Sequence, residues 1–314
     1  MRTLNNKLII SNLIFFVMLL LFVAFIIYHQ PYLLLIVSLI LFIVLFYLIN
    51  WNILKEYRSG LDKNYLINDE ELIELINTNI KKLIFPVYLS DENYEIVAKN
   101  KTASLLGGDL YNYLVDSENN YWFAIGDASG HDLNSHLFSM MILTQMNYLV
   151  KSTETPKNIS KKINLHLQER LKVYPDIDKN AYASLAIIKA NKDGSCIHYG
   201  QHPNFILCKA KTNELQVIET DGDFIGLSLD DRKQNLDDKK FIMQSGDILF
   251  TFTDGLFEQK NKENKYFGYR LYNFIKKHPK EDLKLFADKL FEEVYNFSGK
   301  GVDDDVTLMI IKKK

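Results

Sequence analysis

The stretch Tyr121-Trp122-Phe123-Ala124-Ile125-Gly126-Asp127-Ala128-Ser129-Gly130-His131 joins an apolar run to an acidic turn. The apolar residues are bounded by Asn119-Asn120 on one side and Gly126 on the other, which predicts a strand. A carboxylate that directly follows a strand lies on a tight turn at a rigid strand end. Asp127 is therefore well placed to converge with other acidic residues.

Three further motifs place Asp beside Gly, or in an acidic run, at the edge of a strand-like segment. They are Gly107-Gly108-Asp109, Thr253-Asp254-Gly255 and Asp303-Asp304-Asp305-Val306-Thr307. Any one alone is more often a simple turn than a ligand. Converging carboxylates repel one another and are costly to desolvate unless a cation joins them. Oxygen ligands with no nearby Cys and few His indicate Mg²⁺ or Mn²⁺ rather than zinc.

In this order the motifs resemble those of the metal-dependent (PPM-type) serine/threonine phosphatases. The resemblance is to the branch of the stage II sporulation protein E and of the phosphatases that control bacterial stress sigma factors. It covers roughly residues 85–312 and rests on Gly107-Gly108-Asp109-Leu110-Tyr111, Gly126 to His131, Gln201-His202-Pro203, Thr253-Asp254-Gly255-Leu256 and Asp304-Asp305-Val306-Thr307. The many strands and two groups of helices indicate an α+β fold. The resemblance sharpens this to a β-sandwich flanked by helices.

The resemblance also implies a set of metal ligands for two Mn²⁺ or Mg²⁺ ions. Asp109 would bind one ion, Asp127 would bridge both, and the backbone carbonyl of Ala128 would complete a shell. Asp254 and Asp304 would bind the other ion. Two hard cations about 3.5–4 Å apart hold a bridging water, lower its pKa and neutralise charge on the phosphoryl oxygens. Asp305 is the less favoured ligand of its motif, and Asp303 is interpreted as a solvated turn residue.

Two histidines, His131 and His202, occupy the family's two histidine positions. Either could orient a water or protonate the serine leaving group, and together with Asp109 and Asp127 they are the catalytic candidates. The alternative is a structural histidine bonded to a backbone carbonyl. Ser129 is not interpreted as a nucleophile, because no Ser-His-Asp order is evident and a metal-bound water already supplies one.

The loops around the motifs depart from the family pattern. Asp132 stands where Gly is usual, Gln201 replaces the Gly before His202, and His136 stands where small residues are usual. These changes bear on substrate fit more than on metal binding. No Arg lies beside the motifs, so phosphate recognition would depend mainly on metals. This is consistent with a folded protein substrate, and the family suggests a STAS-type anti-sigma-factor antagonist.

The first fifty residues differ in composition from the rest. Leu8 to Tyr28 and Pro31 to Ile49 are apolar runs of spanning length, which predicts a transmembrane helical hairpin. Basic residues flank the pair, and the connecting loop has none: Arg2 and Lys7 come before, and Lys55, Arg58 and Lys63 come after. The positive-inside rule then places both termini and the catalytic domain in the cytoplasm, on a multi-pass protein of the inner (cytoplasmic) membrane.

The chain is thus divided into a transmembrane hairpin at 1–52, a linker or signalling helix at 53–85 and a phosphatase domain at 86–314. Asn68 caps the linker helix, which Pro86 ends. Heptad spacing of Leu66, Ile73, Ile76, Ile80 and Leu83 fits a homodimer through residues 68–84. An amphipathic helix packed on its own domain fits equally well.

Within the predicted phosphatase domain, residue patterns predict alternating blocks of strands and helices. Strands are expected at Tyr94–Ala98, Asp109–Val115, Tyr121–Ile125, Ala181–Lys189, Ser195–Tyr199, Asn204–Lys209, Leu215–Glu219, Lys240–Met243, Ile248–Phe252 and Val306–Ile311. Helices are expected at Asn134–Val150, Pro156–Val173 and Asp282–Phe297.

Composition and motif details argue against two further classes of function. A net charge of −2 gives no reason to expect nucleic-acid binding, and Cys196 and Cys208 are interpreted as buried small hydrophobes. A signalling cyclase is disfavoured, because Leu110-Tyr111 follows the Gly-Gly-Asp where those enzymes need Glu-Phe. The remaining alternative to a phosphatase is a membrane-anchored binding module of the same fold that is catalytically weak or inactive.

Overall fold

The computed structural model describes residues 17–18, 21–22, 87–103, 107–130, 133–151, 154–173, 181–227, 236–278, 282–299 and 301–314. The predicted transmembrane runs fall almost entirely outside these residues, and the helix predicted at 68–84 and His131 fall wholly outside them. In the part of the chain that is described, no helix combines the length and apolar character needed to span a bilayer. The chain separates into two compact units, Met1–Ile76 and Asn77–Lys314, and the second contains all the acidic motifs.

Two antiparallel sheets form the second unit. One has the order β3-β4-β5-β6-β9, made by Asp109–Val115, Tyr121–Ala128, Ala183–Ala190, Ser195–Tyr199 and Lys239–Ile242. The other has the order β1-β2-β11-β10-β7-β8, made by Tyr88–Ser90, Tyr94–Lys101, Val306–Lys313, Ile248–Phe252, Phe205–Cys208 and Leu215–Ile218. We refer to them as the β4 sheet and the β10 sheet.

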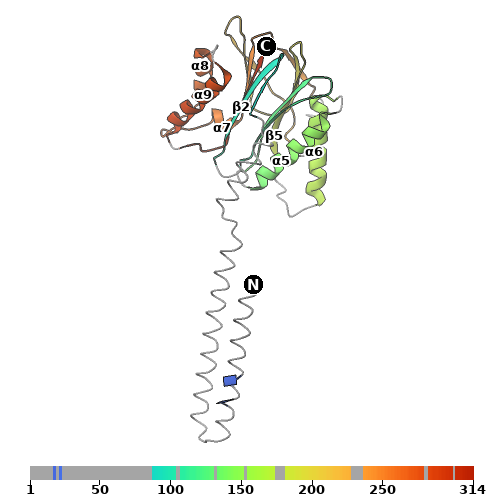
Figure 1. Cartoon of the computed structure of the whole chain (residues 1–314), viewed down its shortest axis with the longest axis vertical. Helices are drawn as coiled ribbons and strands as arrows, with labels where there is room; N and C mark the ends of the chain where they lie inside the picture. The colour runs from blue at the N-terminus through green and yellow to red at the C-terminus, as the bar shows by residue number, and fades with distance from the viewer. Residues whose placement is uncertain are drawn as a thin grey trace. The chain divides into compact units, whose positions relative to one another are not determined.

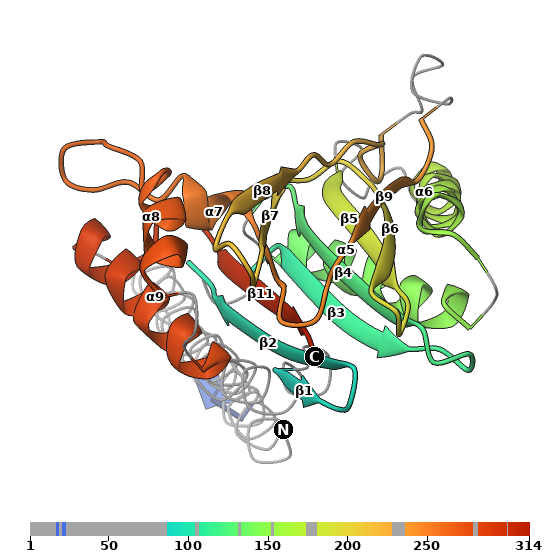
Figure 2. The same cartoon turned by 90° about the horizontal axis from the view of Figure 1, so that it is seen from above.

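Helices cover the outer face of each sheet, as Figures 1 and 2 show. Helices α5 (Leu133–Leu149) and α6 (Pro156–Val173) pack on the β4 sheet. Helices α7 (Asp254–Phe257), α8 (Arg270–Lys277) and α9 (Leu283–Ser298) lie on the side of the β10 sheet. The expected β-sandwich flanked by helices is therefore confirmed for the described residues.

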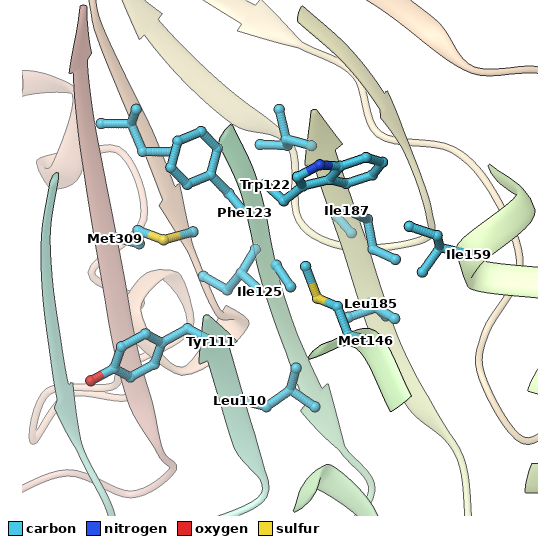
Figure 3. Packing of buried hydrophobic residues seen from close by; sticks show 14 of the residues in the cluster. Leu110, Tyr111, Trp122, Phe123, Ile125, Met146, Ile159, Leu185, Ile187 and Met309 are labelled. Carbon is cyan, nitrogen blue, oxygen red and sulfur yellow. The ribbon is translucent and has the colours of Figure 1, made fainter. Parts of the chain in front are cut away.

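The alternation of side chains along β4 divides the core into two layers (Figure 3). Trp122 faces Met146 of α5 and Ile159 of α6, on the helix side of the sheet. Phe123 and Ile125 face the β10 sheet. Continuing this period of two from Ile125 places the side chain of Asp127 on the inner face, at the end of the strand.

Most predicted elements are present, with bounds shifted by a few residues. Cys196 and Cys208 are free and buried, as predicted. Helices α7 and α8 were not predicted. In α8 only Leu271 and Ile275 are buried, so the apolar pattern is too short to distinguish the helix from a loop.

Candidate active site

The first half of the site comes from two neighbouring strands of the β4 sheet. Asp109 begins β3 and Asp127 lies near the end of β4, and the register pairs them directly. Side chains directly opposite on an antiparallel pair lie about 4.5–5.5 Å apart at Cβ. Asp109 is buried, and Asp127 is partly buried. The strand register therefore brings together two carboxylates that are distant in sequence.

Two threonines of the β10 sheet hold the carboxylate of Asp109. The hydroxyls of Thr253 and Thr307 donate to Oδ2 of Asp109 at 2.8 and 2.6 Å. The two threonines also bind each other, because the Thr307 backbone N–H donates to Oγ1 of Thr253 at 3.0 Å. These bonds join the end of β3 to the ends of β10 and β11, across the two sheets.

The second half of the site begins at the same strand ends. Asp254 follows Thr253 and opens the single turn α7, while Asp304 lies shortly before β11. Gly255 packs so closely on the backbone carbonyl of Asp305 that a Cβ atom there would collide with it, and would lie 3.4 Å from Cβ of Asp304. Both Asp254 and Asp304 are exposed. The close approach at Gly255 explains why Gly must follow Asp254, and it keeps these two carboxylates near each other.

Asp305 supports the turn that precedes Asp109. Its Oδ2 accepts the backbone N–H of Gly108 at 2.7 Å and its Oδ1 accepts that of Ala103 at 2.8 Å. Its side chain is buried. The sequence marked Asp305 as the less favoured ligand of its motif, and these contacts give both of its oxygens a structural role.

Helix α5 holds the same turn from the other side. His136 is buried and its Nδ1 lies 3.0 Å from the carbonyl oxygen of Gly107. Because a carbonyl only accepts, Nδ1 carries the proton. The hydroxyl of Ser139 donates to the carbonyl oxygen of Gly108. The sequence singled out His136 only as a departure from the family, and Ser139 was missed because a hydroxyl within a helix gives no signal.

The carboxylates of the site raise one another's pKa. Burial, and then the charges of Asp254, Asp304 and Asp305, together raise the pKa of Asp127 to about 8. Burial also raises the pKa of Asp109 well above its usual range, followed by the charge of Asp127, although the two threonine hydroxyls oppose this. The pKa of Asp254 is raised by partial desolvation and then by Glu258.

This donor set fits a hard divalent cation in charge and in atom type. The groups that surround Asp127 electrostatically are carboxylates, and a cation would relieve their repulsion. Among the described residues, no three carboxylate, imidazole or thiolate groups are already gathered closely enough to hold an ion. The geometry thus supplies the ligands in one region, without a finished coordination sphere.

Of the remaining candidates, His202 lies in the interior. Its Nδ1 is 3.0 Å from Oγ of Ser184, which in turn accepts the backbone N–H of Asp127 at 3.2 Å. Burial lowers the pKa of His202 to about 3, so the ring is neutral at neutral pH. These contacts favour a structural role over proton transfer, and the catalytic role of His202 stays a prediction.

Ser129 and Ala128 occupy the turn after β4. Ser129 is held against Tyr182, since its backbone N–H donates to the Tyr182 carbonyl at 2.8 Å and its hydroxyl accepts the Tyr182 N–H at 3.2 Å. The backbone N–H of Ala128 donates to the Gly108 carbonyl at 3.2 Å. The turn is therefore tied both to the diglycine turn and to the residue before β5.

Comparison with known families identifies one match. Residues 117–314 match the family model of stage II sporulation protein E (SpoIIE). The matched segment includes Asp127, His202, Asp254 and Asp304, whereas Asp109 lies just before it. Among proteins of curated function, no relative of this sequence is found.

Solved structures with the same fold confirm the architecture. The SiaA-PP2C domain of Pseudomonas aeruginosa has a TM-score of 0.58 at 16% identity, over 82% of this chain and 97% of that one. The PP2C phosphatase domain of SpoIIE from Bacillus subtilis, with a fragment of its regulatory domain, has a TM-score of 0.55 at 20% identity, over 72% of this chain and 65% of that one. RsbX in complex with magnesium has a TM-score of 0.53 at 16% identity, over 72% and 98% of the two chains. The domain therefore has the PP2C fold, and the chain spans slightly less than two thirds of the SpoIIE fragment.

Proposed function

Because the chain belongs to the stage II sporulation protein E family, we propose that it is a metal-dependent phosphatase of phosphoserine or phosphothreonine on a regulatory protein. Asp109, Asp127, the carbonyl of Ala128, Asp254 and Asp304 would hold two Mn²⁺ or Mg²⁺ ions. Bound ions of this kind activate a water and neutralise charge on the phosphoryl oxygens. The magnesium in the similar RsbX structure supports this assignment.

The single observation that carries the proposal is the pair of threonine hydroxyls on Asp109. They join the end of β3 to the ends of β10 and β11, which places the acidic motifs at one edge of the sandwich. Several carboxylates held close together are unfavourable without a bound cation, because the charge of each one raises the cost of ionising the next. The alternative is a binding module of the same fold with weak or absent phosphatase activity, and the assay below distinguishes the two.

The test compares two neighbouring aspartates. Asp304→Asn removes a proposed ligand, whereas Asp303→Asn makes the same chemical change at an exposed residue beside it. The full-length chain is assayed in detergent with p-nitrophenyl phosphate and a phosphoserine peptide, at increasing Mn²⁺ or Mg²⁺. We expect Asp304→Asn to lose activity and the metal-induced rise in melting temperature, and Asp303→Asn to keep both. Equal behaviour of the two variants, or activity of the wild type in EDTA, would contradict the proposal.

For the natural substrate, a STAS-type anti-sigma-factor antagonist is the partner that family membership favours. The site contains no described Arg that contacts its carboxylates, so recognition of the protein substrate would depend on the metals and on surfaces outside the metal site. Release of phosphate from purified phosphorylated STAS proteins of the same cell tests this assignment. A preference for unrelated phosphoproteins would contradict it.

We also propose that residues 1–52 anchor the protein in the inner (cytoplasmic) membrane as a helical hairpin. The support is the two apolar runs and the basic residues that flank them. Both ends then face the cytoplasm. A reporter fused after Lys314 should be active only in the cytoplasm, and activity on the outside would contradict this topology.

Control through the helix at 68–84 is a separate proposal. Its heptad-spaced Ile73, Ile76, Ile80 and Leu83 would pair two chains, and the dimer state would shift the active-site loops. Replacing Ile76 and Ile80 with Asp should give a monomer with altered basal activity and intact metal binding. If the wild type is already monomeric in sedimentation, with activity untouched by the double change, the helix is a passive tether.

A further inference from the structure

An exposed aromatic cluster adjoins the acidic site on the side of α7. The rings of Phe257, Tyr269 and Tyr272 surround one another, with centroids 6.4 Å apart for Phe257–Tyr269, 6.5 Å for Phe257–Tyr272 and 6.0 Å for Tyr269–Tyr272. Tyr269 is 80% exposed and Tyr266 is 55% exposed. Tyr is enriched in protein interfaces, where its ring supplies contact area and its hydroxyl can form a hydrogen bond.

The backbone fixes these rings in place. The N–H of Gly268 donates to the carbonyl of Phe257 at 2.8 Å, and Lys260 forms a bridge with Tyr266, where its Nζ lies 5.1 Å from the ring centre. The chain between α7 and α8 therefore folds back on itself, and it projects from the molecule in Figure 2. A rigid platform of this kind loses little conformational entropy when a partner binds. We call the ring cluster of Phe257, Tyr269 and Tyr272, together with Lys260, Lys262 and Tyr266 of the chain segment between α7 and α8, the tyrosine face.

The tyrosine face begins one helical turn from the proposed metal ligand Asp254. Phe257 is three residues after Asp254 in α7, and residues at this spacing are neighbours on a helix surface. A protein bound to the tyrosine face would therefore present a neighbouring residue to the acidic site.

The charge of this segment is opposite to that of the site. Residues 257–277 contain six Lys or Arg and two Glu, in a chain of net charge −2. Two of these cations have acidic partners, since Lys265 pairs with Glu263 at 2.7 Å and Arg270 with Glu293 at 4.0 Å. Lys260 and Lys262 are exposed. The surface thus carries an excess of positive charge that complements acidic side chains.

We propose that the tyrosine face docks the phosphoprotein substrate through an acidic segment beside its phosphorylated serine or threonine. This inference rests on the proposed phosphatase function and adds the chemistry of the partner. The positive charge of Lys260 and Lys262 attracts the acidic segment, and the tyrosines provide contact area and hydroxyl groups. The phosphorylated residue then reaches the site at Asp254.

An anionic membrane is the other partner that a basic aromatic surface could take. Membrane-binding surfaces insert Trp, Phe and Leu, whereas the exposed residues of this face are Tyr and Lys. Its position beside Asp254 also gives it direct access to a substrate. Both observations favour a protein.

The experiment uses the full-length chain in detergent and two phosphoserine peptides that differ only in three Glu or three Gln beside the phosphoserine. Tyr269→Ala with Lys262→Gln alters the tyrosine face, and Tyr148→Ala with Lys151→Gln makes the same changes at exposed residues of and just after α5. Fluorescence anisotropy measures peptide binding whether or not the chain is catalytically active. Hydrolysis of p-nitrophenyl phosphate reports the site itself.

We expect the wild type to bind the Glu peptide about tenfold more tightly than the Gln peptide, with the difference reduced at high salt. The tyrosine-face variant should lose this preference and keep its activity on p-nitrophenyl phosphate, while the α5 variant keeps both.

An absent preference, or one that survives in the tyrosine-face variant, overturns the docking proposal. Flotation with phosphatidylserine vesicles that depends on Tyr269 and Lys262, without a peptide effect, would identify a membrane surface instead. Failure to hydrolyse p-nitrophenyl phosphate at any Mn²⁺ concentration contradicts only the phosphatase function.

Discussion

The two halves of the acidic site are built in different ways. Asp109 and Asp127 belong to paired strands of the β4 sheet, and Asp109 is buried with two threonine hydroxyls on one oxygen. Asp254 and Asp304 are exposed at the ends of the β10 sheet, where close packing of Gly255 on Asp305 keeps them together. One half is positioned by side-chain hydrogen bonds and the other by backbone contact.

This difference determines how much each half of the site is stabilised by a bound cation. Ionising Asp127 within the fold is unfavourable, because burial and three neighbouring carboxylates raise its pKa to about 8. The exposed half keeps contact with water, which screens its charges. A cation therefore gains most of its advantage at the buried half, while the exposed half is the more open to solvent and to a substrate.

The largest effect is expected from Asp127→Asn, which removes the proposed bridging ligand from the buried half. Phosphate release should fall on the order of a thousandfold, since the metal supplies several kcal/mol of charge stabilisation. The metal-free variant should be at least as stable as the wild type, because a repelled carboxylate is gone. Activity and melting temperature with and without Mn²⁺ measure both effects.

A folded Asp127→Asn protein that retains near wild-type turnover in Mn²⁺ would refute the two-metal mechanism. If instead the metal-free variant melts well below the wild type, Asp127 stabilises the fold, and repulsion between the carboxylates does not destabilise the buried half.

The next largest effect is expected from Gly255→Ala in the exposed half. The new Cβ meets the Asp305 carbonyl, so α7 must move away from β11 at a cost of about 1–3 kcal/mol. Activity should fall more than about tenfold, because Asp254 is displaced by a distance that matters for catalysis. Gly301→Ala is the control, with a positive φ of 98° but nothing within 4 Å of the new atom. It should lose about 1 kcal/mol of stability and little activity.

If both alanine variants lose the same stability and activity, the close packing at Gly255 is not what holds the exposed half, because an added Cβ at Gly301 meets no neighbouring atom. Denaturant midpoints and phosphatase activity on the same samples separate the two explanations.

Much of this site could be predicted from the sequence, because each acidic motif follows or precedes a strand. The apolar run Tyr121–Ile125 predicted that Asp127 lies at a strand end, but because both faces of this strand are buried, the direction of its side chain came only from the structure. The pairing of Asp109 with Asp127 required the register, which depends on contacts distant in sequence. The same holds for Thr253 and Thr307, since a threonine in a strand is common and gives no sign of its partner.

The sequence was least informative where structure depends on single contacts. The support that Asp305 gives to Gly108 joins residues 197 positions apart. His136 was recognised as unusual, but its bond to Gly107 depends on where α5 starts on the β4 sheet. Helix α8 was missed because tertiary packing of Leu271 and Ile275, rather than a long apolar pattern, defines it.

A moderate effect is expected when the turn before Asp109 loses one of its two supports. Asp305→Asn replaces one acceptor by an amide that faces a backbone N–H, and should cost about 2 kcal/mol of stability and weaken metal binding. His136→Ala removes one hydrogen bond from α5 and leaves a cavity, so it should cost about 2–4 kcal/mol of stability, but it keeps both contacts of Asp305 with the turn. Mn²⁺ titrations should therefore shift more for Asp305→Asn than for His136→Ala. The reverse order would mean that α5, not β11, positions the buried half.

The smallest effect concerns the contact between the two sheets away from the site. His198 of β6 is 1% exposed and lies against Phe205 of the β10 sheet and Phe241 of β9, with ring centroids 5.7 and 5.6 Å away. Its Nδ1 has no hydrogen-bond partner among the described residues. Burial, and then the charge of Lys239, lowers the pKa of His198 to about 4.

The direction of the pH effect follows from this lowered pKa. Between the unfolded value of about 6.5 and the folded value of about 4, the unfolded chain binds a proton that the folded chain does not. The stability seen at pH 7 is therefore lost as the pH falls through this window, by at most about 3 kcal/mol from His198.

His198→Phe keeps an aromatic ring between the sheets and removes the titrating group. Urea midpoints at pH 7 and pH 4.5, followed by tryptophan fluorescence, should differ less for this variant than for the wild type. Other groups contribute to both proteins alike: His202, whose pKa is also lowered, adds to the loss, whereas the raised pKa values of Asp109 and Asp127 oppose it, because there the folded chain binds the extra protons. If the variant keeps the whole wild-type acid sensitivity, the sensitivity arises elsewhere in the molecule, and protonation of His198 does not weaken the contact between the sheets.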